Sequence, residues 1–462
     1  MRQMRPQITM GESKKPQPVL TDTERFPLIR DLSFLNKLRN DQFAPRYNFK
    51  SGDRLNECHL EKLKSYNSTL VADKKFWKEG ETPHWLTPYL NWCQRTVRFY
   101  RHHPSDFLDQ PTMNRLDIKN VPWDFVSTDC DLADLMVYKT SGTTAAAIDI
   151  LFEPFSQASY LPLLQSLLRD YDVELTAQPD SVATALITDQ QEAITYASIS
   201  TYLNGAGVLR VNLNVNDWND LSHRTSYLEK YNPEVLTGDP FSLLSLIELK
   251  PKIKPKAIVS SAIRMTQGVK CKLEQYFQCV VLDTYSMTEC KMVAVETNGK
   301  YKALRPDVYL EIFDKDVDVA LPMGERGELV ITGGHNSFLP LIRYRTGDFC
   351  SLVIEDDIPY LVDLEARNPI AFYDSSGRFV NYVNISKTLV VFPLAAFQLH
   401  QFSNGNLSFT GWTNEALDDQ VTNALLAIFG KDILLDIQLL PVENKSSAKP
   451  ISYSSDKKGV RG

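Results

Sequence analysis

The sequence lacks several features that mark whole classes of protein. No run of 18 apolar residues occurs, which argues against a membrane-spanning helix. The seven cysteines include no C-x-x-C pair, so we expect reduced thiols in a cytoplasmic protein without a disulfide framework or zinc site. No block of Lys and Arg is present and the net charge is −7, so nucleic acid is not an expected partner. No G-x-S-x-G elbow is present, which sets aside a serine hydrolase.

The composition indicates a soluble globular protein of more than one domain. Apolar residues make up 43% and charged residues 23% of the chain. A length of 462 residues exceeds what one ordinary core organises, so we expect a large and a smaller domain. Residues 1–20 are polar and contain proline but no apolar h-region, which predicts a disordered tail and no signal peptide.

The order of predicted elements places the chain in the α/β class. Between residues 135 and 283 strands alternate with helices, which is typical of a mostly parallel sheet covered by helices on both faces. Residues 154–169 and 194–203 are read as two of these helices. From residue 305 short strands and turns predict an antiparallel β section. We therefore expect a large domain over residues 21–366 and a small α+β lid domain over residues 367–462.

Four polar stretches, taken in chain order, describe a nucleotide site. The first is a hydroxyl-rich loop, Ser141–Thr144, whose N–H and O–H groups can converge on phosphate, although such a run also caps helices. The second contains Tyr285 and Glu289 directly after a predicted strand. The third places Asp348 behind a glycine, where its two oxygens can accept both ribose hydroxyls or bond a turn of its own backbone. The fourth ends at Arg367.

These stretches together resemble the adenylate-forming superfamily of acyl-CoA synthetases, adenylation domains and luciferases. The patterns Y-x-x-T-E, G-E-L-V-x-T, R-Y-R-T-G-D and L-E-x-R carry the resemblance over roughly residues 115–460. P-L-I-R-Y-R-T-G-D, which ends at Asp348, is most similar to the phenylacetate–CoA ligase-like branch. The resemblance implies ATP and Mg²⁺ as cofactors, a small carboxylic acid as substrate and a lid domain that rotates between two poses.

The resemblance also implies a role for individual residues. Tyr285 is similar to the aromatic residue that stacks on adenine, Glu289 to the magnesium-holding carboxylate and Asp348 to the ribose acceptor. The remaining implied ATP or AMP contacts are Ser141, Gly142, Thr143, Thr144, Ser261, Ala262, Thr288 and Arg367. Position in the fold alone implies acid-pocket walls at Tyr196, Ser200, Gly205 and Gly238. The catalytic lysine of the lid is best matched by Lys449, with Lys458 as the second choice and a solvated tail lysine as the alternative.

Three departures from the family pattern leave the outcome open. The phosphate loop continues as Ala145-Ala146-Ala147 without the usual glycine and lysine, Pro369 replaces the hinge aspartate, and Ala448 replaces a glycine. The leading hypothesis is an acyl-adenylate-forming ligase that passes the acyl group to coenzyme A. An amine or a carrier protein is the alternative acceptor, and a non-catalytic nucleotide-binding homologue is the alternative function. For Cys290, beside Glu289, we favour a buried structural thiol over a covalent acyl carrier.

Overall fold

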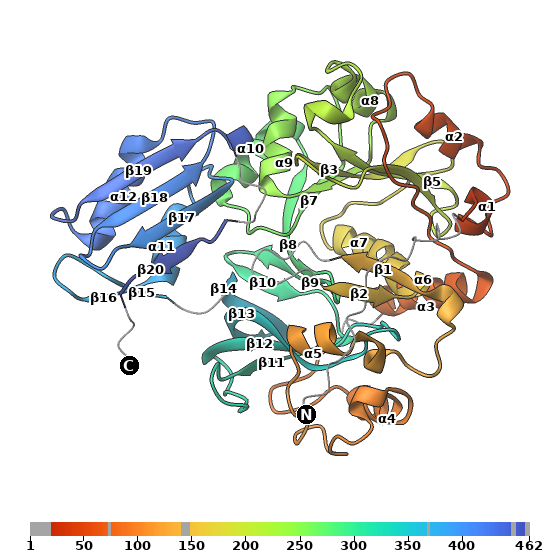
Figure 1. Ribbon diagram of the computed structural model, residues 1–462, viewed down its shortest axis with the longest axis horizontal. Coiled ribbons are helices and arrows are strands. Elements are labelled where there is room, and N and C mark those ends of the chain that lie inside the picture. Colours follow the sequence, from red (N-terminus) through yellow and green to blue (C-terminus); the bar gives the residue numbers. More distant parts are fainter. Residues whose placement is uncertain (1–19, 73–74, 140–147, 367–369, 445–449, 458–462) are drawn as a thin grey trace, which may run out of the picture.

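The computed structural model describes residues 20–72, 75–139, 148–366, 370–444 and 450–457. Most of this chain is organised by a twelve-stranded sheet, and a four-stranded sheet near the C-terminus lies beside it (Figure 1). The α/β class predicted from the alternation of strands and helices is confirmed. The predicted domain limits at residues 20 and 366 stay predictions.

Half of the large sheet is parallel and carries the strands expected from the sequence. Its parallel strands are β8 Val280–Met287, β7 Ala257–Ser260, β6 Val235–Gly238, β3 Val182–Thr188 and β5 Ala206–Asn212, in spatial order. The central strands β3, β6 and β7 are short, mostly apolar and buried, as parallel strands between two layers of helices must be. The carboxyl ends of β6, β7 and β8 lie next to one another, which is where ligands bind in such sheets.

One predicted helix of this half is wrong. Residues 194–203 contain β4 Tyr196–Ser200, which forms the edge of the sheet and pairs antiparallel with β5 from Tyr196↔Arg210 to Ser200↔Ala206. The segment has small and β-branched side chains that suit a pleated, half-buried surface. Its backbone groups are therefore satisfied by the neighbouring strand, and the local helical reading gives way to that pairing.

Helices cover both faces of the parallel half. One face carries α2 Ser33–Arg39, α8 His223–Tyr231, α9 Pro240–Glu248 and α10 Gln267–Phe277, which share one buried cluster with the strands. The other face carries α3 Glu57–Ala72 and α7 Tyr160–Arg169, with α6 Pro154–Ala158 directly before α7. The helix predicted over residues 154–169 is thus two helices that meet at Ser159.

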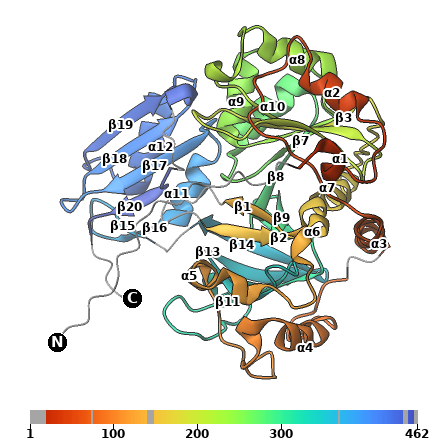
Figure 2. The ribbon, with the colours of Figure 1, turned by 45° about the vertical axis from the view of Figure 1, so that its right-hand side comes forward.

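The second half of the large sheet is antiparallel, as predicted. Its strands are β9 Lys291–Thr297, β10 Lys300–Ala303, β14 Ile358–Ala366, β13 Leu341–Glu355, β12 Arg326–Gly333 and β11 Val308–Phe313, in spatial order. A separate hairpin pairs β1 Met136–Lys139 with β2 Asp149–Phe152. The short helices α1 Asp22–Arg25, α4 Leu86–Thr96 and α5 Arg115–Asn120 belong to the N-terminal part, in which α4 and α5 lie near the antiparallel half (Figures 1 and 2).

The C-terminal part has a core of its own and also docks on α9 and α10. It contains β15 Ala371–Tyr373, β16 Phe379–Asn381, α11 Tyr382–Leu389, β17 Ala396–Gln401, β18 Leu407–Trp412, α12 Asp418–Phe429, β19 Leu435–Leu440 and β20 Tyr453–Ser455. Strand β16 gives way to α11 at Asn381, whose side chain caps the helix by accepting a hydrogen bond from the Val383 N–H. Trp412 and Val442 are buried in the same cluster as Phe241 of α9. This docking closes one side of the candidate site.

Candidate functional site

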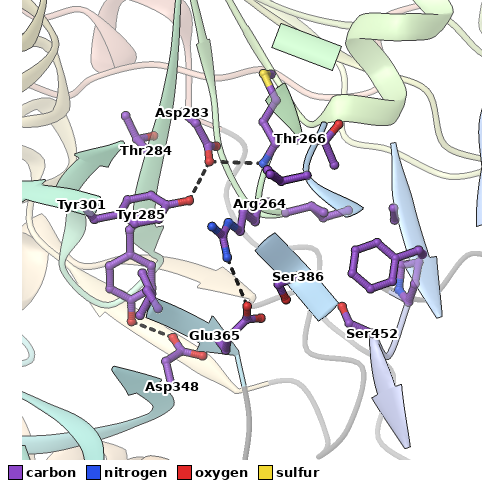
Figure 3. Close-up of a pocket in the computed structure, with 18 of the residues that line it drawn as sticks. Arg264, Thr266, Asp283, Thr284, Tyr285, Tyr301, Asp348, Glu365, Ser386 and Ser452 are labelled. Atoms are coloured by element: carbon purple, nitrogen blue, oxygen red, sulfur yellow. Dashed lines mark hydrogen bonds and ion pairs between the residues drawn. The ribbon is translucent and has the colours of Figure 1, made fainter. Parts of the chain in front are cut away.

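A cavity of about 180 Å³ lies between the large sheet and the C-terminal part (Figure 3). Its walls come from the β7–α10 loop, β8, β10, β13 and β14 on one side, and from α11, β17 and the segment before β20 on the other. It lies beyond the carboxyl end of β7, where the topology predicts a ligand. Among its polar lining residues are Arg264, Thr266, Asp283, Thr284, Tyr285, Tyr301, Asp348, Glu365, Ser386 and Ser452.

Tyr285 and Asp348, predicted from distant parts of the sequence, meet in this cavity. The Tyr285 hydroxyl donates to Asp348 Oδ2 at 2.6 Å. Burial, and then the adjacent carboxylate, raise the pKa of Tyr285 far above its usual value, so the phenol remains protonated. Asp348 follows Gly347, whose φ of +80° turns the chain within β13, and its own N–H donates to Thr346 Oγ1 at 3.1 Å. The structure thus places a flat aromatic ring beside a carboxylate that can accept hydrogen bonds from hydroxyl groups.

A third acidic residue, Asp283, lines the inner wall of the cavity, and no role was predicted for it from the sequence. Its Oδ2 accepts hydrogen bonds from the Tyr301 hydroxyl at 2.7 Å and the Met265 N–H at 3.2 Å. Burial raises the pKa of Asp283 to about 6 despite these donors. Its place directly after the apolar run Val280–Leu282, two residues before Tyr285, is the signal that could have identified it.

Glu289, the predicted magnesium ligand, lies outside the lining of this cavity. Its side chain is only 4% exposed. Its Oε1 accepts from the Tyr344 hydroxyl at 3.1 Å and lies 3.8 Å from Arg115 Nη1. Thr288, beside it, is exposed. Neither Tyr344 nor Arg115 was singled out from the sequence, because nothing local shows that α5 and β13 meet at Glu289.

The Glu289 carboxylate suits Mg²⁺ only as one ligand, with the remaining ligands supplied by the phosphates of a nucleotide and by water. In the described part of the chain, no group of three or more His, Cys, Asp and Glu side chains could hold a metal ion. Mg²⁺ keeps near-octahedral oxygen coordination and is commonly held by one or two carboxylates together with substrate phosphates. Glu289 fits that role, provided that the ion takes the place of Arg115 beside its carboxylate.

The other predicted contacts fall into two groups. Ala262 lines the cavity and has φ +72°, a left-handed conformation that is uncommon for a residue with a Cβ. Ser261 lies beside it and donates its N–H to Gly238 O at 3.0 Å. Tyr196 and Ser200 lie on edge strand β4, and Gly205 follows that strand. None of these last three, nor Gly238, is among the described lining residues of the cavity, so their acid-pocket role stays a prediction.

Several predicted residues lie outside the described residues. They are Ser141, Gly142, Thr143, Thr144, Arg367, Lys449 and Lys458. Cys290 is described: it is 1% exposed, and burial raises the pKa of its thiol to about 12. This setting supports the structural reading of Cys290, because a protonated thiol is a poor nucleophile.

Comparison with known proteins places the fold. No family model matches the chain. Over 199 residues it is 27% identical to a phenylacetate-coenzyme A ligase of Pseudomonas putida, a match that covers 39% of this chain and 44% of the relative. Over 152 residues it is 28% identical to protein CapK of Staphylococcus aureus, with 31% of each chain covered. The chain thus spans less than half the length of the curated relatives it matches.

The similarity to solved structures extends over most of the chain. A 2-hydroxyisobutyryl-CoA ligase in the post-adenylation state, in complex with 2-HIB-AMP, aligns over 84% of this chain and 93% of its own, with TM-score 0.59 and 14% identity. The open conformation of that ligase, in complex with 2-HIB-AMP and CoA, aligns over 80% and 89%, with TM-score 0.50 and 15% identity. The predicted resemblance to the adenylate-forming superfamily is confirmed at the level of the fold.

Proposed function

We propose that this chain, which has the fold of the adenylate-forming ligases, activates a carboxylic acid with ATP and transfers the acyl group to a nucleophile. The observation that carries the proposal is the meeting of Tyr285 and Asp348, 2.6 Å apart, in a cavity at the carboxyl end of the parallel strands. A ring to stack on a base and a carboxylate to accept ribose hydroxyls are what a nucleoside requires.

In the first proposed step, a carboxylate oxygen of the substrate attacks the α-phosphorus of ATP. A new P–O bond forms, the bond to the bridging oxygen breaks, and pyrophosphate leaves. The reacting groups are both anionic, so positive charge must accumulate around them. We assign Glu289 to hold Mg²⁺ and Thr288 to contact the phosphates. Bound Mg²⁺ would neutralise phosphate charge, and Lys449 is the proposed cation beside the attacking oxygen.

In the second step, the sulfur of coenzyme A attacks the acyl carbon of the adenylate. The C–S bond forms, the C–O bond to AMP breaks, and the thiol proton passes to solvent. Coenzyme A is the first choice because one of the curated relatives and the aligned solved structure are both CoA ligases. An amine or a carrier-protein thiol is the alternative acceptor, since Pro369 alters the predicted hinge between the two steps.

The location of the protein is proposed on two observations. All seven cysteines are free, as expected for thiols in a reducing compartment. In the part of the chain that the structure describes, no helix has the length and apolar character to cross a membrane. We propose that the protein is cytoplasmic, with a small-molecule acid as its partner.

Acid-dependent exchange of labelled pyrophosphate into ATP tests the first step. We expect exchange with at least one member of a broad panel of carboxylic acids, and none when the acid or Mg²⁺ is left out. ATP binding without exchange across the whole panel would instead favour the non-catalytic homologue, for which the three alanines after Thr144 are the motivating observation. Adding coenzyme A to an active mixture and following thioester formation then tests the acceptor.

A further inference from the structure

The cationic side chain in the described lining of the cavity has no role in the function proposed above. Arg264, on the loop between β7 and α10, is the only Lys or Arg among the described lining residues, which include the acids Asp283, Asp348 and Glu365. Its Nη1 donates to Glu365 Oε1 at 3.1 Å, and one third of its side chain is exposed. In Figure 3 the guanidinium is seen between Tyr285 and Ser386, which belongs to helix α11 of the C-terminal part.

The charges of the cavity indicate which part of a nucleotide it takes. Three carboxyl groups and one guanidinium line the cavity. These surroundings are unfavourable for a triphosphate, because its negative charges would be repelled by the carboxylates. The residues assigned to the phosphate end, Thr288 and Glu289, are not among its described lining residues. The nucleoside is therefore the part of a nucleotide that matches this cavity. Arg264 would then lie beside the base and the sugar.

We propose that Arg264 binds the purine ring opposite Tyr285, and that Glu365 positions its guanidinium. A guanidinium is planar, stacks on aromatic rings and offers five N–H donors, of which the described contact with Glu365 uses one. Ring nitrogens of a purine can accept from the others. Glu365 lies near the end of β14, on the same side of the cavity as Arg264, and its hydrogen bond holds the guanidinium in place. This inference rests on the proposed use of a nucleotide and adds a base-binding residue to it.

The test is equilibrium binding of adenosine, AMP and ribose 5-phosphate to the full chain and its variants, by calorimetry. Arg264→Met should weaken adenosine and AMP by the same factor, about tenfold, and leave ribose 5-phosphate unchanged. A purely structural role would not separate these three ligands. Arg264→Lys, which keeps the charge but not the plane, should fall between Met and the wild type, and it serves if the Met variant does not fold.

A matched control lies next to the cavity. Lys387 Nζ pairs with Asp363 at 2.8 Å and joins α11 to β14, the strand that also carries Glu365, but neither residue is a described lining residue of the cavity. Lys387→Met should bind all three ligands like the wild type. Glu365→Ala should weaken adenosine about threefold to fivefold, and Arg264→Met/Glu365→Ala should bind no more weakly than Arg264→Met alone, because the two residues act as one unit.

The outcomes separate the two proposals. If the wild type binds neither adenosine nor AMP, the proposed function and this inference both fail. If the wild type binds adenosine and Arg264→Met binds it equally well, only this inference fails. A loss confined to AMP would overturn the base contact and move Arg264 to the phosphate. Fully additive losses in the double variant would overturn the positioning role of Glu365.

Discussion

The two carboxylates that the sequence singles out, Asp348 and Glu289, lie in different surroundings. Asp348 is partly exposed, faces a cavity and accepts a hydrogen bond from Tyr285. Glu289 is buried beneath Tyr344 and close to Arg115. A ribose hydroxyl could bind Asp348 in place of the Tyr285 phenol. A metal ion could reach Glu289 only by displacing a cation.

The nucleoside end of the site, at Asp348, is therefore already formed. At the metal end, Mg²⁺ must take the place of the Arg115 cation beside Glu289. Asp348 needs no counter-charge, because neutral hydroxyl groups are its proposed partners. Glu289 has its negative charge compensated within the protein, and Mg²⁺ must compete with that compensation. The nucleoside end should therefore bind ligands on its own, whereas the metal end should respond to the nucleotide phosphates.

The largest expected effect is at the metal end. Glu289→Gln keeps an acceptor for Tyr344 but removes the charge that attracts Mg²⁺, so acid-dependent pyrophosphate exchange should fall about a hundredfold to a thousandfold. Rates measured over a range of free Mg²⁺ check this. Tyr344→Phe, which removes only the hydroxyl, is the control and should lose much less. An unchanged Mg²⁺ dependence in Glu289→Gln would refute the metal role.

The next effect is at the nucleoside end. Asp348→Ala removes the acceptor proposed for both ribose hydroxyls, and hydrogen bonds to a charged group contribute about 1.5–3 kcal/mol. The KM for ATP should therefore rise roughly tenfold to a hundredfold, with the unfolding temperature little changed. Tyr285→Phe, which keeps the ring and loses the 2.6 Å hydrogen bond, should cost far less. Asp348→Ala with wild-type ATP dependence contradicts the assignment.

A third prediction concerns pH and Asp283 in the inner wall of the cavity. The pKa of Asp283 in the folded protein is about 6, above its ordinary value of 3.8, so the folded state holds this proton more tightly than the unfolded state. Its contribution to stability is full below pH 3.8 and is lost as the pH rises through 6. Asp283→Asn keeps the acceptor and removes the titration, so its stability relative to the wild type should increase by about 2 kcal/mol between pH 4 and 7. Urea unfolding at both pH values measures it, and an equal difference at the two would speak against a perturbed Asp283.

The smallest expected effect is that of removing the Arg115 cation beside Glu289. Arg115 and Glu289 lie 3.8 Å apart and Arg115 is partly exposed, so their attraction is worth at most about 1 kcal/mol. Arg115→Met should lower the Mg²⁺ concentration needed for half-maximal exchange by up to about fivefold. A higher Mg²⁺ requirement would show instead that Arg115 assists the metal end.

The sequence predicts the parts of this site that depend on chain order. The alternation of strands and helices between residues 135 and 283 was predicted from the sequence, and the ends of such parallel strands then place Tyr285 at a shared edge. Asp348 was located by its motif, although it lies inside the long strand β13. Local pattern is sufficient where neighbouring residues determine the conformation.

The remaining features depend on contacts between distant segments. β4 was read as a helix, because its pairing with β5 is not visible in its own residues. The Arg264–Glu365 pair joins residues 101 positions apart, and the Glu289–Arg115 pair joins α5's first residue to the loop after β8. A charged side chain in one sequence does not reveal its partner, so the compensation of Glu289 had to come from the structure.

A crystal structure of the protein with AMP is the decisive test of the proposed nucleoside site. We expect the ribose hydroxyls within hydrogen-bonding distance of Asp348 and the adenine against the Tyr285 ring, with the hydrogen bond between Tyr285 and Asp348 broken or shared. AMP bound elsewhere, while the Tyr285–Asp348 contact remains intact, would contradict it.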